Sequence, residues 1–144
     1  MTTAQQLDAW LQAVASRAFC WQTWHCGHFA ADWVLLATGH AMALGLPPQQ
    51  EPRAWARALA QAGGMRGHLL RHTGAKALPG FMAQVGDVVM LPGRVVPQAL
   101  GVCAGSQVAC VAHTGVAMRP LLEAAACWRL ADLAATRQPA GAAA

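Results

Sequence analysis

The chain has 144 residues, of which 56% are hydrophobic and 11% are charged. This length is typical of a single domain and is sufficient to bury a core of apolar side chains. The formal net charge of +4 comes from nine arginines and one lysine against six acidic residues, and because the arginines are scattered singly, without basic clusters or interleaved aromatic residues, we exclude nucleic-acid binding.

Neither a membrane span nor a signal peptide is predicted. The longest apolar stretch, residues 29–46, is interrupted by Asp32 and by the Thr-Gly-His run at 38–40, and it is therefore unlike a spanning helix. Residues 1–8 lack the basic start and the apolar run of a signal peptide, so we expect the protein to remain in the compartment where it is made.

Helices are predicted in the first half of the chain. Thr3 and Gln6 have the spacing of a capping box, with apolar residues at helical spacing behind them. Gly39 can end a second helix, Pro52 is acceptable in the first turn of a third, and the glycine pair at 63–64 can end that one. The predicted helices are residues 4–17, 26–38, 52–62 and 65–72.

From Gly86 onward the pattern changes to short β-type runs. The predicted strands are residues 87–91, 98–103, 107–111, 116–119 and 127–130, with turns at 92–93 and 105–106 and a short helix from Pro120 to about residue 126. Helices followed by a meander of strands indicate an α+β fold. We expect one domain over residues 1–130 and a disordered tail at 131–144, which lacks apolar bulk.

The chain contains five cysteines, an odd number, and no Cys-x-x-Cys pair. In a chain without an export signal this argues against a disulfide framework, so we expect free thiols. Cys26 is the one candidate nucleophile, because a thiol in the first turn of a helix lies near unpaired N–H groups that favour the thiolate. The alternative is that Cys26 is a small core residue.

Metal binding is the other use of the cysteines and histidines. Four of these residues lie within nine positions: Cys20, His25, Cys26 and His28. Adjacent side chains at a helix start point in different directions, however, and no second pair completes a closed site. His68 and His72 share a helix face but are flanked by arginines and are expected to be solvated. We predict no metal ion and no cofactor.

The tryptophans near Cys26 have two possible roles. Trp33 is expected in the core, as is usual for a large aromatic side chain on an apolar helix face. Trp21 and Trp24 fit either the core or the wall of a groove that binds a peptide or glycan, and the sequence leaves this choice open.

A set of motifs resembles a family of small phage and prophage proteins associated with the tail tip. The first motif runs from Trp24 to Val34 and is closed by Thr38-Gly39. The later motifs are Gly63-Gly64, residues 86–89, residues 99–103 with Gly105, and Pro120-Leu121 leading to Trp128-Arg129. The likeness covers roughly residues 19–130. This family is similar to the NlpC-type cysteine peptidases.

The resemblance implies a papain-like, NlpC-type domain in which N-terminal helices pack on a small antiparallel sheet. Cys26 then matches the nucleophile, and Gly86-Asp87 matches the opening of the strand before the one that carries the catalytic histidine. This chain has Ala99 at the histidine position. His113 falls near the place of the third polar residue and is the candidate substitute base. His25 replaces the aspartate that usually precedes the cysteine.

Two functions follow from the resemblance. The first is a structural or assembly protein of a phage or prophage tail tip, which lacks a complete catalytic dyad and docks on tail hub or tip proteins. It would occur in the virion tail, and in the host bacterial cytoplasm during assembly. The second is a cysteine hydrolase that uses Cys26 to cut cell-wall peptide during genome delivery. Ala99 favours the first function, and the retained Cys26 keeps the second open.

Overall fold

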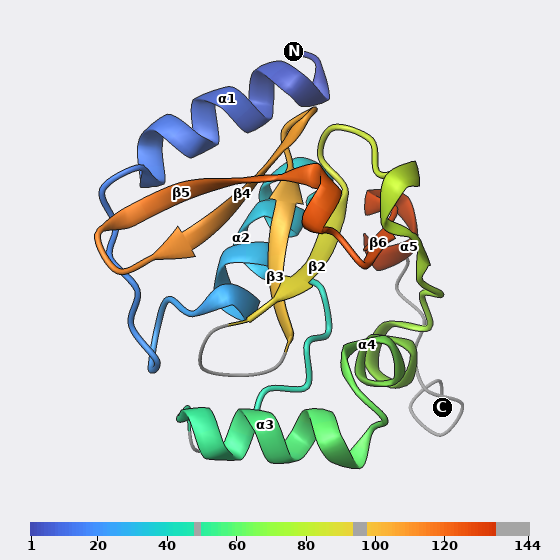
Figure 1. The fold of residues 1–144 in the computed structure, drawn as a ribbon. Coiled ribbons are helices and arrows are strands. Elements are labelled where there is room, and N and C mark those ends of the chain that lie inside the picture. The colour runs from blue at the N-terminus through green and yellow to red at the C-terminus, as the bar shows by residue number, and fades with distance from the viewer. Residues whose placement is uncertain (48–49, 94–97, 135–144) are drawn as a thin grey trace.

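The computed structural model describes residues 1–47, 50–93 and 98–134, and it shows helices around one six-stranded antiparallel sheet of order β1-β6-β2-β3-β4-β5 (Figure 1). The expected α+β class is confirmed. The helices are α1 (Thr3–Val14), α2 (Cys26–Thr38), α3 (Pro52–Gln61), α4 (Met65–Thr73) and α5 (Leu130–Ala134). The strands are β1 (Leu78–Pro79), β2 (Val88–Pro92), β3 (Gln98–Cys103), β4 (Gln107–Ala112), β5 (Gly115–Pro120) and β6 (Ala126–Trp128).

Helix α2 is the central helix of the fold and packs mainly against β3. Its bounds are those predicted, and Gly39 ends it in the left-handed conformation with φ of 76°, which a residue with a Cβ rarely adopts. Four side chains on its inner face are fully buried: Phe29, Ala30, Trp33 and Val34. This apolar face positions the first residue of the helix, Cys26, against the sheet.

Strand β2 lies inside the sheet, between β3 and β6. Val88 pairs with Val102 on one side and with Trp128 on the other. The four residues from Val88 to Leu91 are all buried, because α2 and α5 cover one face of the sheet while η1 (Gly80–Met82) and η2 (Leu121–Glu123) lie near the other. A strand covered on both faces reads as a continuous apolar run.

The N-terminal capping box is one residue earlier than predicted. Thr2 is the N-cap, and its side chain accepts a hydrogen bond from the backbone N–H of Gln5, whose side chain accepts one in return. Thr2 and Thr3 are chemically equal candidates for this position, so the local sequence could not choose between them. Helix α1 also ends earlier, at Val14 rather than at residue 17.

The C-terminal prediction was partly wrong. The last strand is Ala126–Trp128 rather than 127–130, and the short helix after Pro120 is the 3₁₀ turn η2. Residues 131–134, expected in a disordered tail, belong to α5, whose Leu133 is 2% exposed. The remainder of the predicted tail, residues 135–144, lies outside the described residues.

Two further features were not predicted. Strand β1 is a two-residue strand that pairs with β6, with Leu78 opposite Cys127. Pro92, expected in a turn, is the last residue of β2.

The bounds of α3 and α4 lie within one residue of the prediction. None of the helices in the described ranges is both long and apolar enough to cross a membrane.

Candidate functional site

Cys26 is the first residue of α2, as predicted, and is 8% exposed. Burial raises the pKa of the Cys26 thiol above its usual value, and nearby backbone groups of Leu100 and Gly27 offset only part of this effect. The side chain of Trp55 acts in the same lowering direction, although its Nε1 makes no hydrogen bond of normal geometry within the described residues. Cys26 shares a buried apolar cluster with Leu100 of β3, and the raised pKa favours the neutral thiol.

His25 precedes Cys26 and acts as the N-cap of α2. Its Nδ1 accepts a hydrogen bond from the Gly27 N–H at 2.9 Å, so the proton of the neutral ring is on Nε2, which donates to Oε1 of Gln50 at 3.1 Å. An aspartate in this position would also be a good N-cap acceptor. His25 thus takes over the capping role while both of its ring nitrogens are engaged away from the thiol.

The second imidazole beside Cys26 is also engaged in capping. Nδ1 of His28 accepts the backbone N–H of His25 at 3.1 Å, and the two rings are 4.0 Å apart. No hydrogen bond from an imidazole to the Cys26 sulfur occurs in the part of the chain that the structure describes. Neither neighbour is therefore placed to take the thiol proton.

Two residues bear on the question of a catalytic base: His113, the candidate substitute, and Ala99, which stands at the position of the expected histidine. His113 is exposed in the turn between β4 and β5, and the structure shows no hydrogen bond between its ring and Cys26. Ala99 is half-buried at the margin of the apolar cluster that contains Cys26. The structure therefore places Cys26 next to β3, and no imidazole among the described residues is hydrogen-bonded to its sulfur.

The segment after α2 covers the start of the helix. A Cβ on Gly27 would lie 2.6 Å from Cδ2 of Leu44 and 2.7 Å from the His25 ring, so Gly27 is needed for this close approach. Leu44 is held in turn by His68, whose Nε2 donates to the Leu44 carbonyl at 2.6 Å. Leu44 and Cys26 belong to the same buried apolar cluster.

His68 is 2% exposed, so the prediction of a solvated histidine face on α4 was wrong. Its ring meets the Trp55 ring edge-on with the ring centres 5.2 Å apart, and the Trp55 ring centre also lies 5.6 Å from that of His25. His72 is half-buried, 4.5 Å from His68. The arginines that flank His68 in the sequence favoured an exposed position. His68 is buried instead because it contacts Trp55, which belongs to another helix.

The buried His25 ring should make stability depend on pH. Burial, followed by the nearby His28, lowers the pKa of His25 from 6.5 to about 4. The unfolded chain therefore takes up the proton first, and stability falls as the pH drops below 6.5 toward 4. From pH 7 to pH 5 we expect a loss of about 2 kcal/mol from this ring, measurable by urea unfolding at each pH.

Asparagine is a good N-cap that does not titrate, so His25→Asn should flatten this part of the pH profile. The exposed His40 supplies the control, since His40→Asn should keep the wild-type slope. An unchanged slope in His25→Asn would contradict the assignment of the neutral ring as a cap.

The tryptophans left open by the sequence are assigned by their burial. Trp33 lies in the core as predicted, and Trp24 is also a core residue at 2% exposure. The guanidinium of Arg17 lies 3.9 Å from the centre of the Trp24 ring, a favourable cation–π distance. Trp21 is half-buried and meets Phe19 edge-on at 4.9 Å. These contacts favour a packing role.

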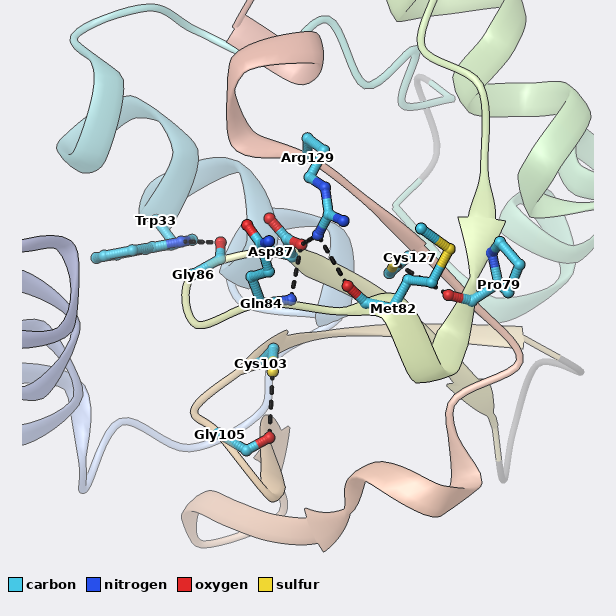
Figure 2. A network of polar contacts seen from close by, with 10 residues as sticks. All are labelled: Trp33, Pro79, Met82, Gln84, Gly86, Asp87, Cys103, Gly105, Cys127 and Arg129. Carbon is cyan, nitrogen blue, oxygen red and sulfur yellow. Dashed lines mark hydrogen bonds and ion pairs between the residues drawn. The ribbon is translucent and has the colours of Figure 1, made fainter.

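A polar network at the Gly86 turn was not predicted (Figure 2). Oδ2 of Asp87 accepts hydrogen bonds from the Gln84 backbone N–H at 2.9 Å and from Nη1 of Arg129, which also donates to the Met82 carbonyl at 2.9 Å. Nε1 of Trp33 donates to the Gly86 carbonyl at 2.8 Å. The network joins α2, η1 and the residue after β6.

Residues 2–130 match the family described as Domain of unknown function (DUF6950). The chain belongs to this family. No curated protein and no solved structure matches it.

The region shared with the DUF6950 family includes both Cys26 with its capping histidine and the Asp87–Arg129 pair. Within the described residues of this DUF6950 domain, no three histidine, cysteine or acidic side chains lie close enough together to hold a metal ion. The chemistry available at the site is therefore that of one buried thiol, two capping imidazoles and an aromatic wall.

Proposed function

We propose that this DUF6950 domain is a papain-like, NlpC-type module that serves as a structural or assembly protein of a phage or prophage tail tip. The proposal rests on the motif resemblance, on the cysteine at the head of α2, and on the packing of that helix against an antiparallel sheet. Fold likeness alone does not assign function, so the state of Cys26 carries the argument.

The single observation that carries the proposal is the sealed thiol. Nucleophilic catalysis needs an imidazole about 3 Å from the sulfur, or a field that holds the thiolate. Cys26 has neither: His25 and His28 are engaged as caps, and burial raises the thiol pKa. The first turn of a helix contributes only about 0.3–1 kcal/mol toward the thiolate. We therefore infer that the domain acts by docking and not by catalysis.

The partners in this proposal are tail hub or tip proteins. The protein would occur in the virion tail, and in the cytoplasm of the host bacterium during assembly. Its net charge of +4 suits acidic partner surfaces. Exposed apolar side chains on η1 and η2, notably Phe81 and Leu122, provide contact area.

The alternative function is a cysteine hydrolase that cuts cell-wall peptide during genome delivery. The observation that favours it is the retention of a thiol at the head of α2. Catalysis would require the buried thiol to become accessible and a base to approach, for which His113 is the candidate.

The experiment is complementation in the phage or prophage that encodes the chain. Deletion of the gene should give particles with defective tails, and the Cys26→Ser variant should restore infectious particles as well as wild type does. Cys103→Ser, which alters another fully buried thiol, is the matched control. The opposite result is that the wild type cleaves purified peptidoglycan, with the activity lost in Cys26→Ser and kept in Cys103→Ser. This result would contradict the proposal and show that the protein is a cysteine hydrolase.

A further inference from the structure

An apolar groove lies between η1 and η2, away from Cys26. It encloses about 590 Å³, and its walls include Pro79 and Phe81 from one side and Leu121, Leu122 and Ala124 from the other. The two 3₁₀ turns are in direct contact, and the groove therefore has walls from two segments that are far apart in sequence.

The rim of this groove is unusually apolar for a protein surface. Phe81 is 83% exposed and Leu122 is 98% exposed, and both line the groove. Met82, which follows Phe81 in the sequence, is 41% exposed. Isolated exposed apolar residues need no explanation, but a patch gathered around a groove is typical of a binding site.

The exposed phenylalanine is presented on a rigid turn. A Cβ on Gly80 would lie 2.1 Å from the Ala124 carbonyl oxygen, so the two turns touch through their backbones. Arg129 donates to the Met82 carbonyl, and the Gln84 N–H donates to Asp87 (Figure 2). Because the turn is already ordered, a partner that covers Phe81 does not have to supply the entropic cost of ordering it.

In the described part of the chain, most charged side chains near the groove are paired with an opposite charge, but Arg66 is not. Glu123 is paired with Arg119 at 2.7 Å and Asp87 with Arg129. Nη2 of Arg66 donates to the Ala125 carbonyl at the groove wall at 3.1 Å, and no carboxylate among the described residues pairs with it. None of the residues that line the groove is acidic, and within the described ranges the one charged side chain seen to reach a lining residue without a carboxylate partner is that of Arg66.

We propose that this groove binds a segment of another protein that places a leucine or phenylalanine between Phe81 and Leu122 and a glutamate or aspartate beside Arg66. A second copy of this chain that docked through the same groove would present the same arginine and no acidic lining residue, so it fits less well. The proposal rests on the docking function above, because the partner would be a neighbouring tail protein, but it makes no use of Cys26.

The probe is an array of short synthetic peptides with two leucine or phenylalanine residues and one glutamate, measured by fluorescence polarisation against the full chain. The same peptides with lysine in place of glutamate form the second half of the array. We expect the glutamate peptides to bind more tightly. Phe81→Ser and Leu122→Ser, which alter exposed side chains and should fold, are expected to weaken binding about tenfold.

The charge variant gives the sharpest result. Arg66→Glu should reverse the preference, so that the lysine peptides bind more tightly than the glutamate peptides. Leu36→Ser changes a 53%-exposed leucine on α2 that does not line the groove, and it should bind as the wild type does.

Three results would overturn the proposal. The first is that no glutamate peptide binds the wild type more tightly than it binds Phe81→Ser, and the second is that Arg66→Glu leaves the preference for glutamate peptides unchanged. The third is that the wild type sediments as a dimer and that Phe81→Ser dissociates this dimer. The last would assign the groove to a second copy. Each of them leaves the docking function standing, whereas thiol-dependent peptidoglycan cleavage would remove that function without bearing on the groove.

Discussion

Replacing Trp33 with alanine should lower the free energy of unfolding by about 4 kcal/mol. The indole is fully buried between α2 and the sheet, 5.5 Å from the ring of Trp10. Its removal leaves a large cavity and also deprives the Gly86 carbonyl of its hydrogen bond at 2.8 Å. Urea unfolding followed by far-UV circular dichroism measures this loss.

Two variants separate the contributions of volume and hydrogen bonding at this position. Trp33→Phe keeps much of the volume but loses the N–H, and we expect a cost of about 2 kcal/mol. Leu36→Ala, at a 53%-exposed site on the same helix, should cost less than about 1 kcal/mol. Equal losses in Trp33→Ala and Leu36→Ala would contradict the position assigned to α2.

Replacing Arg129 with methionine should cost about 3 kcal/mol. The Asp87 side chain is 6% exposed, and Arg129 is its ion-pair partner. Methionine keeps the aliphatic part of the side chain but leaves a buried carboxylate with one remaining hydrogen bond, from the Gln84 N–H. Because Arg129 also holds the Met82 carbonyl, the variant should loosen η1 as well.

A surface pair serves as the control for this prediction. Arg119 and Glu123 have side chains 29% and 38% exposed, so Arg119→Met should cost about 1 kcal/mol or less. In addition, the double variant Arg129→Met/Asp87→Leu should lose less than the sum of the two single variants, because it removes the orphaned charge. Additive losses would show that the ion pair has no coupling energy.

The features that could be predicted from the sequence are those set by local chemistry. The bounds of α2 follow from its apolar face and from Gly39, which supplies the left-handed residue at its end. The placement of Cys26 in the first turn follows from the same pattern. A strand directly after Gly86 was predicted from a continuous apolar run. The run is continuous because β2 is covered on both faces.

The features that could not be predicted depend on contacts between distant segments. His68 is buried because its ring meets Trp55 and the Leu44 carbonyl, whereas its neighbours in sequence are arginines. Residues 131–134 form a helix because Leu133 has a place in the core. The capping roles of the histidines beside Cys26 were also missed, since histidine is not a usual N-cap residue.

The most direct measurement of the central claim is the order in which the cysteines of the folded protein react with iodoacetamide at neutral pH, mapped by mass spectrometry. Cys20 is half-buried, and hydrogen bonding, chiefly to the Thr23 side chain, lowers its pKa. Burial raises the pKa of Cys26. We predict that Cys20 reacts first and that Cys26 reacts only when the protein unfolds. A Cys26 that reacts before Cys20 in the folded protein would contradict the account of a sealed, non-catalytic thiol.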